Sequence, residues 1–198
     1  MITHPQKVLF PDDGITKGDL AGYYEAVADV MVPHIRNRPV TLERFNAGIK
    51  GPRIFQKNVE KGFPAWFKRV QVKKKDGVVN HVLIGDTRSL LWVANQNSIT
   101  PHVWVSRAPK IMKPDLMVFD LDPSDDDLAR LRKGALTLRA LLEELGLESW
   151  VKTSGSKGYH IAVPLDGKAD FGKVATFAHA VGGLLIERDP KNFTGEFY

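Results

Sequence analysis

The spacing of hydrophobic positions changes several times along the chain, and each change predicts a new element of secondary structure. From Thr16 to about His34, apolar side chains recur every three or four residues, which predicts a helix that begins with the capping pair Thr16 and Asp19. The dipeptide Asp76-Gly77 predicts a hairpin turn. The other elements expected in the first half are strands at 38–45, 52–59 and 102–106, two strands within 67–84, and a helix at 87–96.

The second half has a more regular pattern of elements. We expect a strand at 115–122, a helix at 124–145, a strand at 149–153, a tight turn at 154–158, a strand at 159–165 and a helix at 169–187. This order is α/β or α+β in character and fits half of a ferredoxin-like unit. Residues 191–198 predict the start of a further strand.

Composition narrows the class of protein without identifying it. The chain has 198 residues, of which 43% are hydrophobic, enough for one domain of ordinary size or a domain with two lobes. Its net charge of +5 permits a polyanionic partner. It contains no cysteine, which excludes disulfides, thiolate zinc sites and a cysteine nucleophile. No run of about 18 apolar residues occurs, so we expect a soluble intracellular protein and no membrane partner.

Two carboxylates, Asp120 and Asp122, end the apolar strand at 115–122. Residues two apart in a strand point to the same face with their Cα atoms roughly 6.5–7 Å apart, and two ionised carboxylates that close repel each other. A divalent metal such as Mg²⁺ or Mn²⁺ removes this repulsion, and Pro123 stops the strand at a sheet edge. The alternative is that Asp122 caps the next helix and Asp120, expected to be half-buried, makes an ordinary ion pair.

The turn at 154–158 is the second candidate feature. Its backbone N–H groups can converge on an anion because its glycines let the backbone approach closely, and Lys157 adds a positive charge. His160 alternates with Tyr159 and Ile161, so it lies on the face opposite to them. The alternative is a simple hairpin turn with a solvated lysine. The turn is not a P-loop, because it leads into a strand.

Together these motifs resemble the polymerase domain of the bacterial and archaeal ligase D family, within the archaeo-eukaryotic primase superfamily. The segments that carry the resemblance are KVLFP, TKGDLAGYY, HIRNRPVTLERF, IFQKN, PHVW, VFDLDP and TSGSKGYHIAVPL. The resemblance implies a single primase-polymerase domain over 1–198 with a two-lobed fold. An N-terminal lobe would span about 1–110 and bind a 5′-phosphate, and a catalytic half with a ferredoxin- or RRM-like sheet would span about 111–198.

The resemblance also implies functional residues. Asp120 and Asp122 match the family's catalytic, metal-binding carboxylates. The residues that match nucleotide-binding positions are His102, Ser154, Lys157 and His160, and those that match 5′-phosphate-binding positions are His4, Lys7 and Lys17. The family's third carboxylate lies on a later strand, so we expect this chain to stop before the last strands of the fold.

The implied activity is template-directed nucleotidyl transfer that extends primers and fills gaps in non-homologous end joining. The implied cofactor is Mn²⁺ or Mg²⁺, with ribonucleoside or deoxyribonucleoside triphosphates as substrates. The implied partners are 5′-phosphorylated DNA, the Ku protein and an ATP-dependent DNA ligase. The implied location is the cytoplasm, in association with the nucleoid. Two alternatives stay open: a non-catalytic module that captures 5′-phosphorylated ends, and a metal nuclease, for which no water-activating base is recognisable.

Overall fold

The structure is a computed structural model that describes residues 1–59, 62–75 and 77–195. The chain divides into two compact units, Met1–Ile111 and Met112–Tyr198, called unit 1 and unit 2 below. No helix in the described part of the chain combines the length and the hydrophobicity that a membrane span needs.

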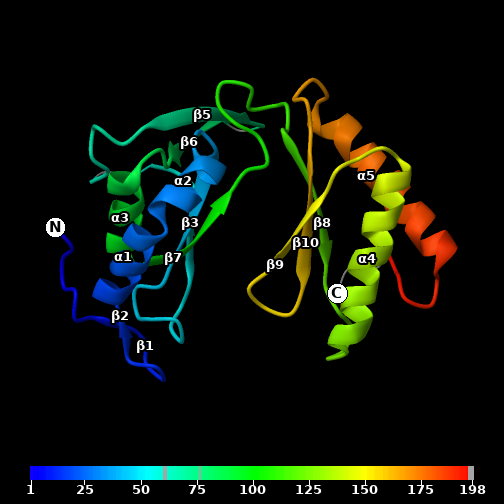
Figure 1. Cartoon of the computed structure of the whole chain (residues 1–198). Coiled ribbons are helices and arrows are strands. Elements are labelled where there is room, and N and C mark those ends of the chain that lie inside the picture. Colours follow the sequence, from blue (N-terminus) through cyan, green and yellow to red (C-terminus); the bar gives the residue numbers. More distant parts are fainter. Residues whose placement is uncertain (60–61, 76, 196–198) are drawn as a thin grey trace. The chain divides into compact units, whose positions relative to one another are not determined.

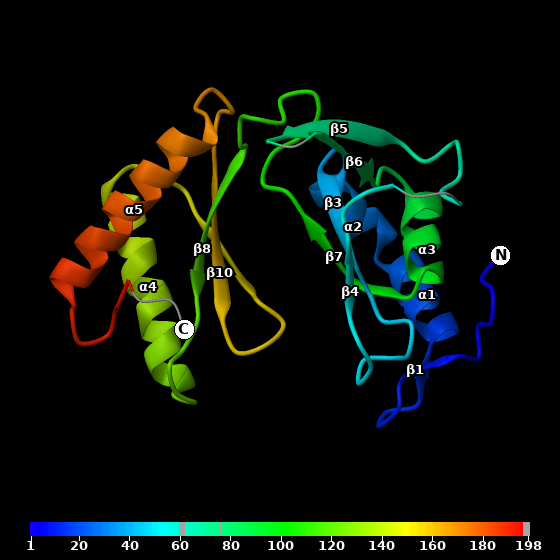
Figure 2. The same ribbon diagram turned by 180° about the vertical axis from the view of Figure 1, so that it is seen from behind.

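Unit 1 is built around an antiparallel sheet whose strands differ in length, with helices packed on one face (Figures 1 and 2). Its described elements are β1 (Val8–Phe10), β2 (Ile15–Thr16), α1 (Lys17–Ala26), α2 (Ala28–Ile35), β3 (Pro39–Arg44), β4 (Ile54–Gln56), β5 (Arg69–Lys74), β6 (Gly77–Leu83), α3 (Thr87–Asn95) and β7 (Ser98–Val103). Strand β3 is central: β7 pairs with it along one edge, while β6 and β4 pair with its beginning and its end. Strands β1 and β2 form a separate small pair beside the start of α1.

The core of unit 1 lies between this sheet and the three helices. Alternate residues of β3, Val40 and Leu42, point into the core, so Thr41 and Glu43 lie on the opposite face. The helices contribute apolar residues at helical spacing, which is why their amphipathic pattern was visible in the sequence. The buried members of the core are Leu9, Leu20, Ala21, Tyr24, Ala28, Val32, Ile35, Val40, Leu42, Phe67, Val82, Ile84, Leu90, Val93 and Ala94.

The single helix predicted from Thr16 to about His34 is wrong in one respect: it is divided into α1 and α2. Val27 leaves the helical region, with φ −96° and ψ 0°, while its N–H still bonds to Tyr23 and its C=O accepts from Met31. Buried residues continue on one face across the break because the change of direction keeps both helices against the sheet. Periodicity alone could not reveal the break, since the buried positions keep their spacing through it.

Unit 2 is a three-stranded antiparallel sheet with two helices. Its described elements are β8 (Leu116–Leu121), α4 (Leu128–Glu144), β9 (Trp150–Thr153), β10 (Tyr159–Pro164) and α5 (Phe171–Arg188). The strand order is β8-β10-β9, so the first strand pairs with the third, as in the corresponding part of a ferredoxin-like unit. Both α4 and α5 lie on the same side of this sheet (Figures 1 and 2).

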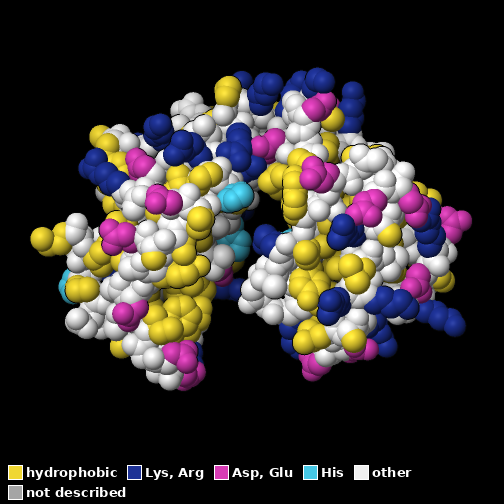
Figure 3. Space-filling view, viewed as in Figure 1, with side chains coloured by type: hydrophobic (Ala, Val, Ile, Leu, Met, Phe, Trp, Pro, Cys, Tyr) yellow, Lys and Arg dark blue, Asp and Glu magenta, His cyan; other side chains and the backbone are white. Residues whose placement is uncertain are grey.

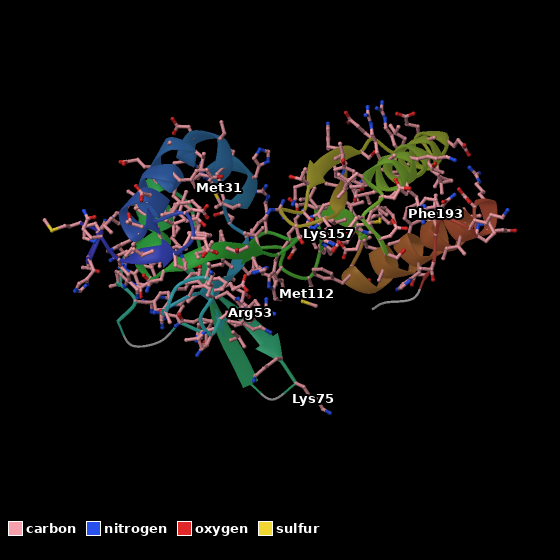
Figure 4. All side chains as sticks on the ribbon, turned by 90° about the horizontal axis from the view of Figure 1, so that it is seen from below. Met31, Arg53, Lys75, Met112, Lys157 and Phe193 are labelled. Atoms are coloured by element: carbon pink, nitrogen blue, oxygen red, sulfur yellow. The ribbon has the colours of Figure 1, made fainter. Side chains whose placement is uncertain are left out.

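The core of unit 2 lies between the sheet and its two helices. Met117 from β8 and Ile161 and Val163 from β10 point towards the helices. After α5 the chain turns back, and the ring of Phe193 packs on α4 beside Gly134 (Figure 4). The buried members are Met117, Ala135, Leu138, Leu141, Leu142, Ile161, Val163, Val181 and Leu185.

Two predicted boundaries, those of α4 and β7, and the expected strand at 191–195 are wrong. Helix α4 begins at Leu128, not at Ser124, because Asp127 is its N-cap and the residues before it form a loop. Strand β7 spans Ser98–Val103, earlier than the predicted 102–106, because its register with β3 begins at Ser98. Residues 191–195 form no strand, and the rest of that predicted strand lies outside the described residues.

Candidate active site and phosphate pocket

Asp120 and His160 lie side by side on the open face of the unit 2 sheet. They are direct cross-strand partners in the antiparallel pair β8–β10, and His160 Nε2 is 3.3 Å from Asp120 Oδ1. The helices cover the other face, which receives Met117 and Ile161. The Asp120 side chain is 59% exposed, so the prediction of a half-buried carboxylate is wrong. The open face leaves this carboxylate accessible to a ligand.

Asp122 touches the turn that joins β9 to β10. A Cβ built on Gly158 would come within 2.6 Å of Asp122 Oδ1 and within 2.5 Å of the carbonyl oxygen of Leu121. Only a glycine fits against the end of β8 without displacing backbone atoms. The turn and the acidic strand end therefore meet within unit 2, as the sequence predicted for adjacent strands.

The turn is closed by a serine. The Ser154 hydroxyl oxygen accepts hydrogen bonds from the N–H of Ser156 (3.3 Å) and of Gly158 (3.0 Å), and Ser154 N–H donates to the Gly158 carbonyl. Gly155 has φ +90°, which favours glycine. Two of the N–H groups expected to converge on an anion are thus used inside the turn. The hydrogen of the Ser154 hydroxyl is still available to donate to a ligand.

Acidic residues outnumber basic ones around this site. Lys157, labelled in Figure 4, pairs with Asp126 (2.6 Å), and Arg130 pairs with Asp125 (2.7 Å). Asp127 caps α4 by accepting from Arg130 N–H. These ion pairs are well exposed, so each contributes little to stability. Figure 3 shows basic and acidic side chains interspersed on the visible surface of the chain. His160 is the basic partner of Asp120, and Lys152 of β9 is in turn the cross-strand partner of His160.

The donor set suits a hard divalent cation. Among the described residues there is no cluster of three or more His, Cys, Asp or Glu side chains arranged to hold a metal ion. An exposed carboxylate on β8 and a second one just beyond its end still match Mg²⁺ or Mn²⁺, because such ions keep several positions for water and phosphate oxygens. Residues Asp120 and Asp122 fit an ion that is shared with a phosphate-bearing ligand.

A second candidate site lies in unit 1, where His4, Lys7 and Lys17 line one cavity of about 620 Å³. Its other lining residues are Pro5, Gln6 and Asn97. The structure therefore brings together all three residues that match the 5′-phosphate-binding positions.

The local sequence builds this cavity by folding the N-terminal segment onto the start of α1. Lys17 N–H donates to the Lys7 carbonyl and Gly18 N–H to the Pro5 carbonyl, both at 2.8 Å. A Cβ on Gly18 would lie 3.2 Å from the Pro5 carbonyl oxygen, so glycine permits the close approach. The Thr16–Asp19 capping box, predicted from the sequence, fixes where α1 begins.

The charges of this cavity are unbalanced. Lys17 is buried, and burial, followed by the positive charge of Lys7, lowers its pKa below the ordinary value of 10.5. Lys17 Nζ donates to the Thr3 hydroxyl, and Lys7 Nζ to the Asn46 carbonyl, both neutral acceptors. Neither lysine has a carboxylate partner in the described part of the chain. An anion would relieve this repulsion, which favours a phosphate-binding role.

His102 lies in unit 1 on β7, opposite Thr41 of β3. Its Nε2 is 3.0 Å from Glu43 Oε2, and its ring lies 5.6 Å from the ring of Phe55. Phe55 is half exposed, whereas Phe63 and Phe67 pack with Trp92. Lys75 lies near the tip of the β5–β6 hairpin (Figure 4). Asp76 of the predicted turn lies outside the described residues.

Comparison with known proteins decides the family. Residues 16–198 match the family described as LigD, primase-polymerase domain. The chain belongs to the LigD primase-polymerase domain family.

Relatives and a solved structure agree with this assignment. The chain is 36% identical over 196 residues to the multifunctional non-homologous end joining protein LigD of Mycolicibacterium smegmatis, covering 98% of the chain and 26% of that protein. It is 31% identical to the bifunctional LigD of Bacillus subtilis, covering 98% of the chain and 31% of that protein. The polymerase domain of Mycobacterium tuberculosis ligase D, solved in complex with DNA, has a TM-score of 0.91 and 34% identity, covering 96% of this chain and 69% of that one.

The LigD assignment confirms the resemblance and the fold class predicted from the motifs. LigD primase-polymerase domains are DNA-directed nucleotidyltransferases of non-homologous end joining, and they use nucleoside triphosphates and metal ions. The chain spans about a quarter to a third of the length of these LigD relatives.

Sequence reasoning missed two residues around His102. Glu43 is a buried acid that contacts His102, and Arg53 contacts Glu43. The available signal was that Glu43 follows the apolar residues Val40 and Leu42 within a strand whose residues are nearly all buried. Arg53 gave no such signal, because it precedes a short strand.

Proposed function

We propose that this chain is a template-directed nucleotidyltransferase that extends primers and fills gaps at double-strand breaks during non-homologous end joining. The observation that carries the proposal is the juxtaposition in unit 2 of Asp120 and Asp122 with His160 and the Ser154–Gly158 turn. This arrangement offers carboxylates for a cation and a turn for phosphates. Units 1 and 2 would be the two lobes of one primase-polymerase domain.

In this proposal Asp120 and Asp122 hold Mn²⁺, or Mg²⁺ in its place. Such an ion, when bound, lowers the pKa of a primer hydroxyl and stabilises charge on the phosphates. The carboxylates fix the ion at the end of β8, because Gly158 and the β8–β10 register hold them there. His160 Nε2 lies 3.3 Å from Asp120 Oδ1 and so restrains the Asp120 side chain.

The nucleoside triphosphate, either ribonucleotide or deoxyribonucleotide, would be contacted by Ser154, Lys157, His160 and His102. Lys157 exchanges its exposed partner Asp126 for a phosphate at little cost, since exposed ion pairs are weak. Ser154 donates its remaining hydroxyl hydrogen. Positive charge near the phosphates stabilises the charge that develops in the transition state.

The DNA end would be recognised in unit 1 by His4, Lys7 and Lys17. The support is a cavity with two lysines whose hydrogen-bond partners among the described residues are neutral. A 5′-phosphate supplies the missing negative charge through charge-assisted hydrogen bonds. We further propose, from the family, that Ku and an ATP-dependent DNA ligase are partners and that the protein acts in the cytoplasm at the nucleoid.

The test is primer extension on a gapped, 5′-phosphorylated duplex with Mn²⁺ and ribonucleotides. Asp120→Ala and Asp122→Ala should each lower the rate by at least about a hundredfold, because metal-assisted stabilisation is worth several kcal/mol. The matched control is Glu148→Gln. Glu148 is an exposed acid that precedes β9, at the end of the strand away from the 154–158 turn, so this variant should extend primers at the wild-type rate.

Wild-type rates in both aspartate variants would contradict the proposed chemistry. If no variant and no wild-type chain incorporates nucleotides while phosphorylated ends still bind more tightly than unphosphorylated ends, the non-catalytic end-binding module is correct instead. Affinity for both kinds of end is therefore measured on the same preparations.

A further inference from the structure

Unit 1 contains a buried carboxylate whose presence the fold does not require. Glu43 lies on β3, and its side chain is only 9% exposed. Burying an ionised carboxylate is costly unless it is paired and hydrogen-bonded. Replacing buried ion pairs by apolar residues is often neutral or stabilising, so stability alone does not explain an acid at this position.

The partners of Glu43 are two basic side chains that reach the surface. Oε2 is 3.0 Å from His102 Nε2, and Oε1 is 3.5 Å from Arg53 Nη1. His102 is 48% exposed and Arg53 68% exposed, so one buried carboxylate holds two accessible groups. Figure 4 labels Arg53, which comes from the segment before β4, whereas His102 comes from β7.

An exposed aromatic ring completes the cluster. Phe55 is the cross-strand partner of Glu43, its ring lies 5.6 Å from the His102 ring, and the Arg53 guanidinium lies 5.7 Å from its centroid. A flat ring flanked by an imidazole and a guanidinium matches a base with its attached phosphates, because bases stack on aromatic rings and phosphates accept from basic groups.

The Glu43 contact fixes the imidazole of His102. An ionised carboxylate only accepts hydrogen bonds, so Nε2 must carry its hydrogen. The ring orientation is then set, and Nδ1 is the nitrogen left to contact a ligand. Carboxylates fix histidine rings in the same way beside metal sites, where removing them costs about 10- to 100-fold in affinity or activity.

We propose that Glu43 is a positioning residue of the nucleotide site, which orients His102 through Nε2 and keeps Arg53 beside the Phe55 ring. This inference rests on the proposed function, in which His102 contacts the nucleoside triphosphate. It adds a residue that does not itself touch the nucleotide and that acts through its two basic partners.

The first measurement is the affinity of the full chain for ATP with Mn²⁺ in Glu43→Ala, His102→Ala and the double variant. Glu43→Ala should weaken binding by about tenfold, the effect of losing one charge-assisted contact. In the His102→Ala background the same change should have a much smaller effect, because most of its action passes through the imidazole. Glu143→Ala, which removes an exposed acid paired with Arg139 on α4, is the matched control and should bind normally.

The second measurement is the imidazole nitrogen spectrum of His102 without nucleotide. Glu43→Ala should shift the Nε2 signal, because Nε2 loses its hydrogen bond to a carboxylate, whereas Glu43→Gln should keep much of this hydrogen-bond signature, since its amide oxygen still accepts. Glu43→Gln should also recover most of the His102-dependent affinity. This variant, which is nearly isosteric, keeps the test decisive if Glu43→Ala does not fold.

Any of four outcomes would overturn the proposal, and three of them concern Glu43→Ala. These are wild-type ATP affinity in Glu43→Ala, an equal loss with and without His102, or an unchanged His102 spectrum in Glu43→Ala. Wild-type affinity in His102→Ala would also overturn it, because Glu43 would then have no nucleotide contact to orient. The proposed function fails separately, since it depends on the Asp120→Ala and Asp122→Ala extension rates.

Discussion

The two candidate sites of this chain have opposite charge imbalances. In unit 1, Lys7 and Lys17 share a cavity with neutral acceptors, and one of them is buried. In unit 2, Asp120 lies exposed on the sheet face that the helices leave uncovered, Asp122 is exposed just beyond β8, and Lys157 of the turn is paired with Asp126. The first site therefore has an excess of positive charge, and the second has an excess of negative charge.

The difference between the sites is also one of burial. A buried charge is poorly solvated, so the cavity of unit 1 is destabilised until its ligand binds. The exposed carboxylates of unit 2 are solvated by water, and their geometry is held instead by close backbone packing at Gly158. We therefore expect substitutions to separate stability from binding in unit 1 and to couple them in unit 2.

The largest expected effect is that of Gly158→Ala in unit 2. The new Cβ would collide with the Leu121 carbonyl and Asp122, so the end of β8 must move. We expect a loss of about 1–3 kcal/mol in the free energy of unfolding, together with weaker Mn²⁺-dependent nucleotide binding. Denaturant unfolding and nucleotide titration measure the two effects.

The control for this substitution is Gly183→Ala on α5. No atom lies within 4 Å of its Cβ, so this change should instead stabilise the helix by about 0.5–1 kcal/mol and leave binding intact. Equal stability of Gly158→Ala and the wild type would mean that packing at the turn does not hold the acidic strand end.

A smaller effect is expected for Lys17→Met in unit 1. This substitution should raise the stability of the protein and weaken its preference for 5′-phosphorylated DNA. Because burial lowers the pKa of Lys17, the unfolded chain binds more protons at alkaline pH, so stability rises as pH increases towards 10.5. Removing the charge should raise the melting temperature by up to about 4 °C at neutral pH. The preference for 5′-phosphorylated over unphosphorylated DNA should fall by about tenfold.

Lys50→Met is the matched control, because Lys50 is exposed and paired with Asp12. It should change neither the melting temperature nor the phosphate preference appreciably. A Lys17→Met protein that is less stable than the wild type would show that the buried ammonium contributes to folding. It would contradict the expectation that the buried charge of unit 1 lowers stability.

The smallest expected effect concerns His81 on β6, a buried histidine away from the cavity. Burial lowers its pKa below 6.5, although its contact with the Val40 carbonyl opposes this. The unfolded chain therefore binds the extra proton first, and the stability of unit 1 falls as pH decreases below 6.5. The slope should stay well below the linkage limit of about 1.4 kcal/mol per pH unit.

His81→Phe removes this titrating group. Thermal unfolding of the variant between pH 5 and pH 7 should therefore depend less on pH than that of the wild type. An unchanged pH dependence would assign the acid sensitivity to other groups.

Much of unit 2 could be predicted from the sequence because its signals are local. The hydrophobic spacing of α4 and α5, the apolar run of β8 and the glycines of the turn each act within a few residues. Juxtaposition of the turn with Asp122 was predictable because a short crossover usually places neighbouring strands in one sheet. The exposure of Asp120 was not, since it depends on which face the helices cover.

Unit 1 was harder to predict because its site depends on contacts between distant segments. The contact of Glu43 with His102 joins residues 59 positions apart, and the burial of Lys17 depends on the N-terminal segment that folds over α1. The break between α1 and α2 also has no signal in the hydrophobic spacing.

The sequence alone determined the elements, the family and the identity of the charged residues, because periodicity, turn chemistry and motifs are written in neighbouring positions. Only the tertiary structure decided which charges are balanced and which are not. Burial and ion pairing arise from segments that meet in space, and the electrostatic energy of a charge depends on those surroundings.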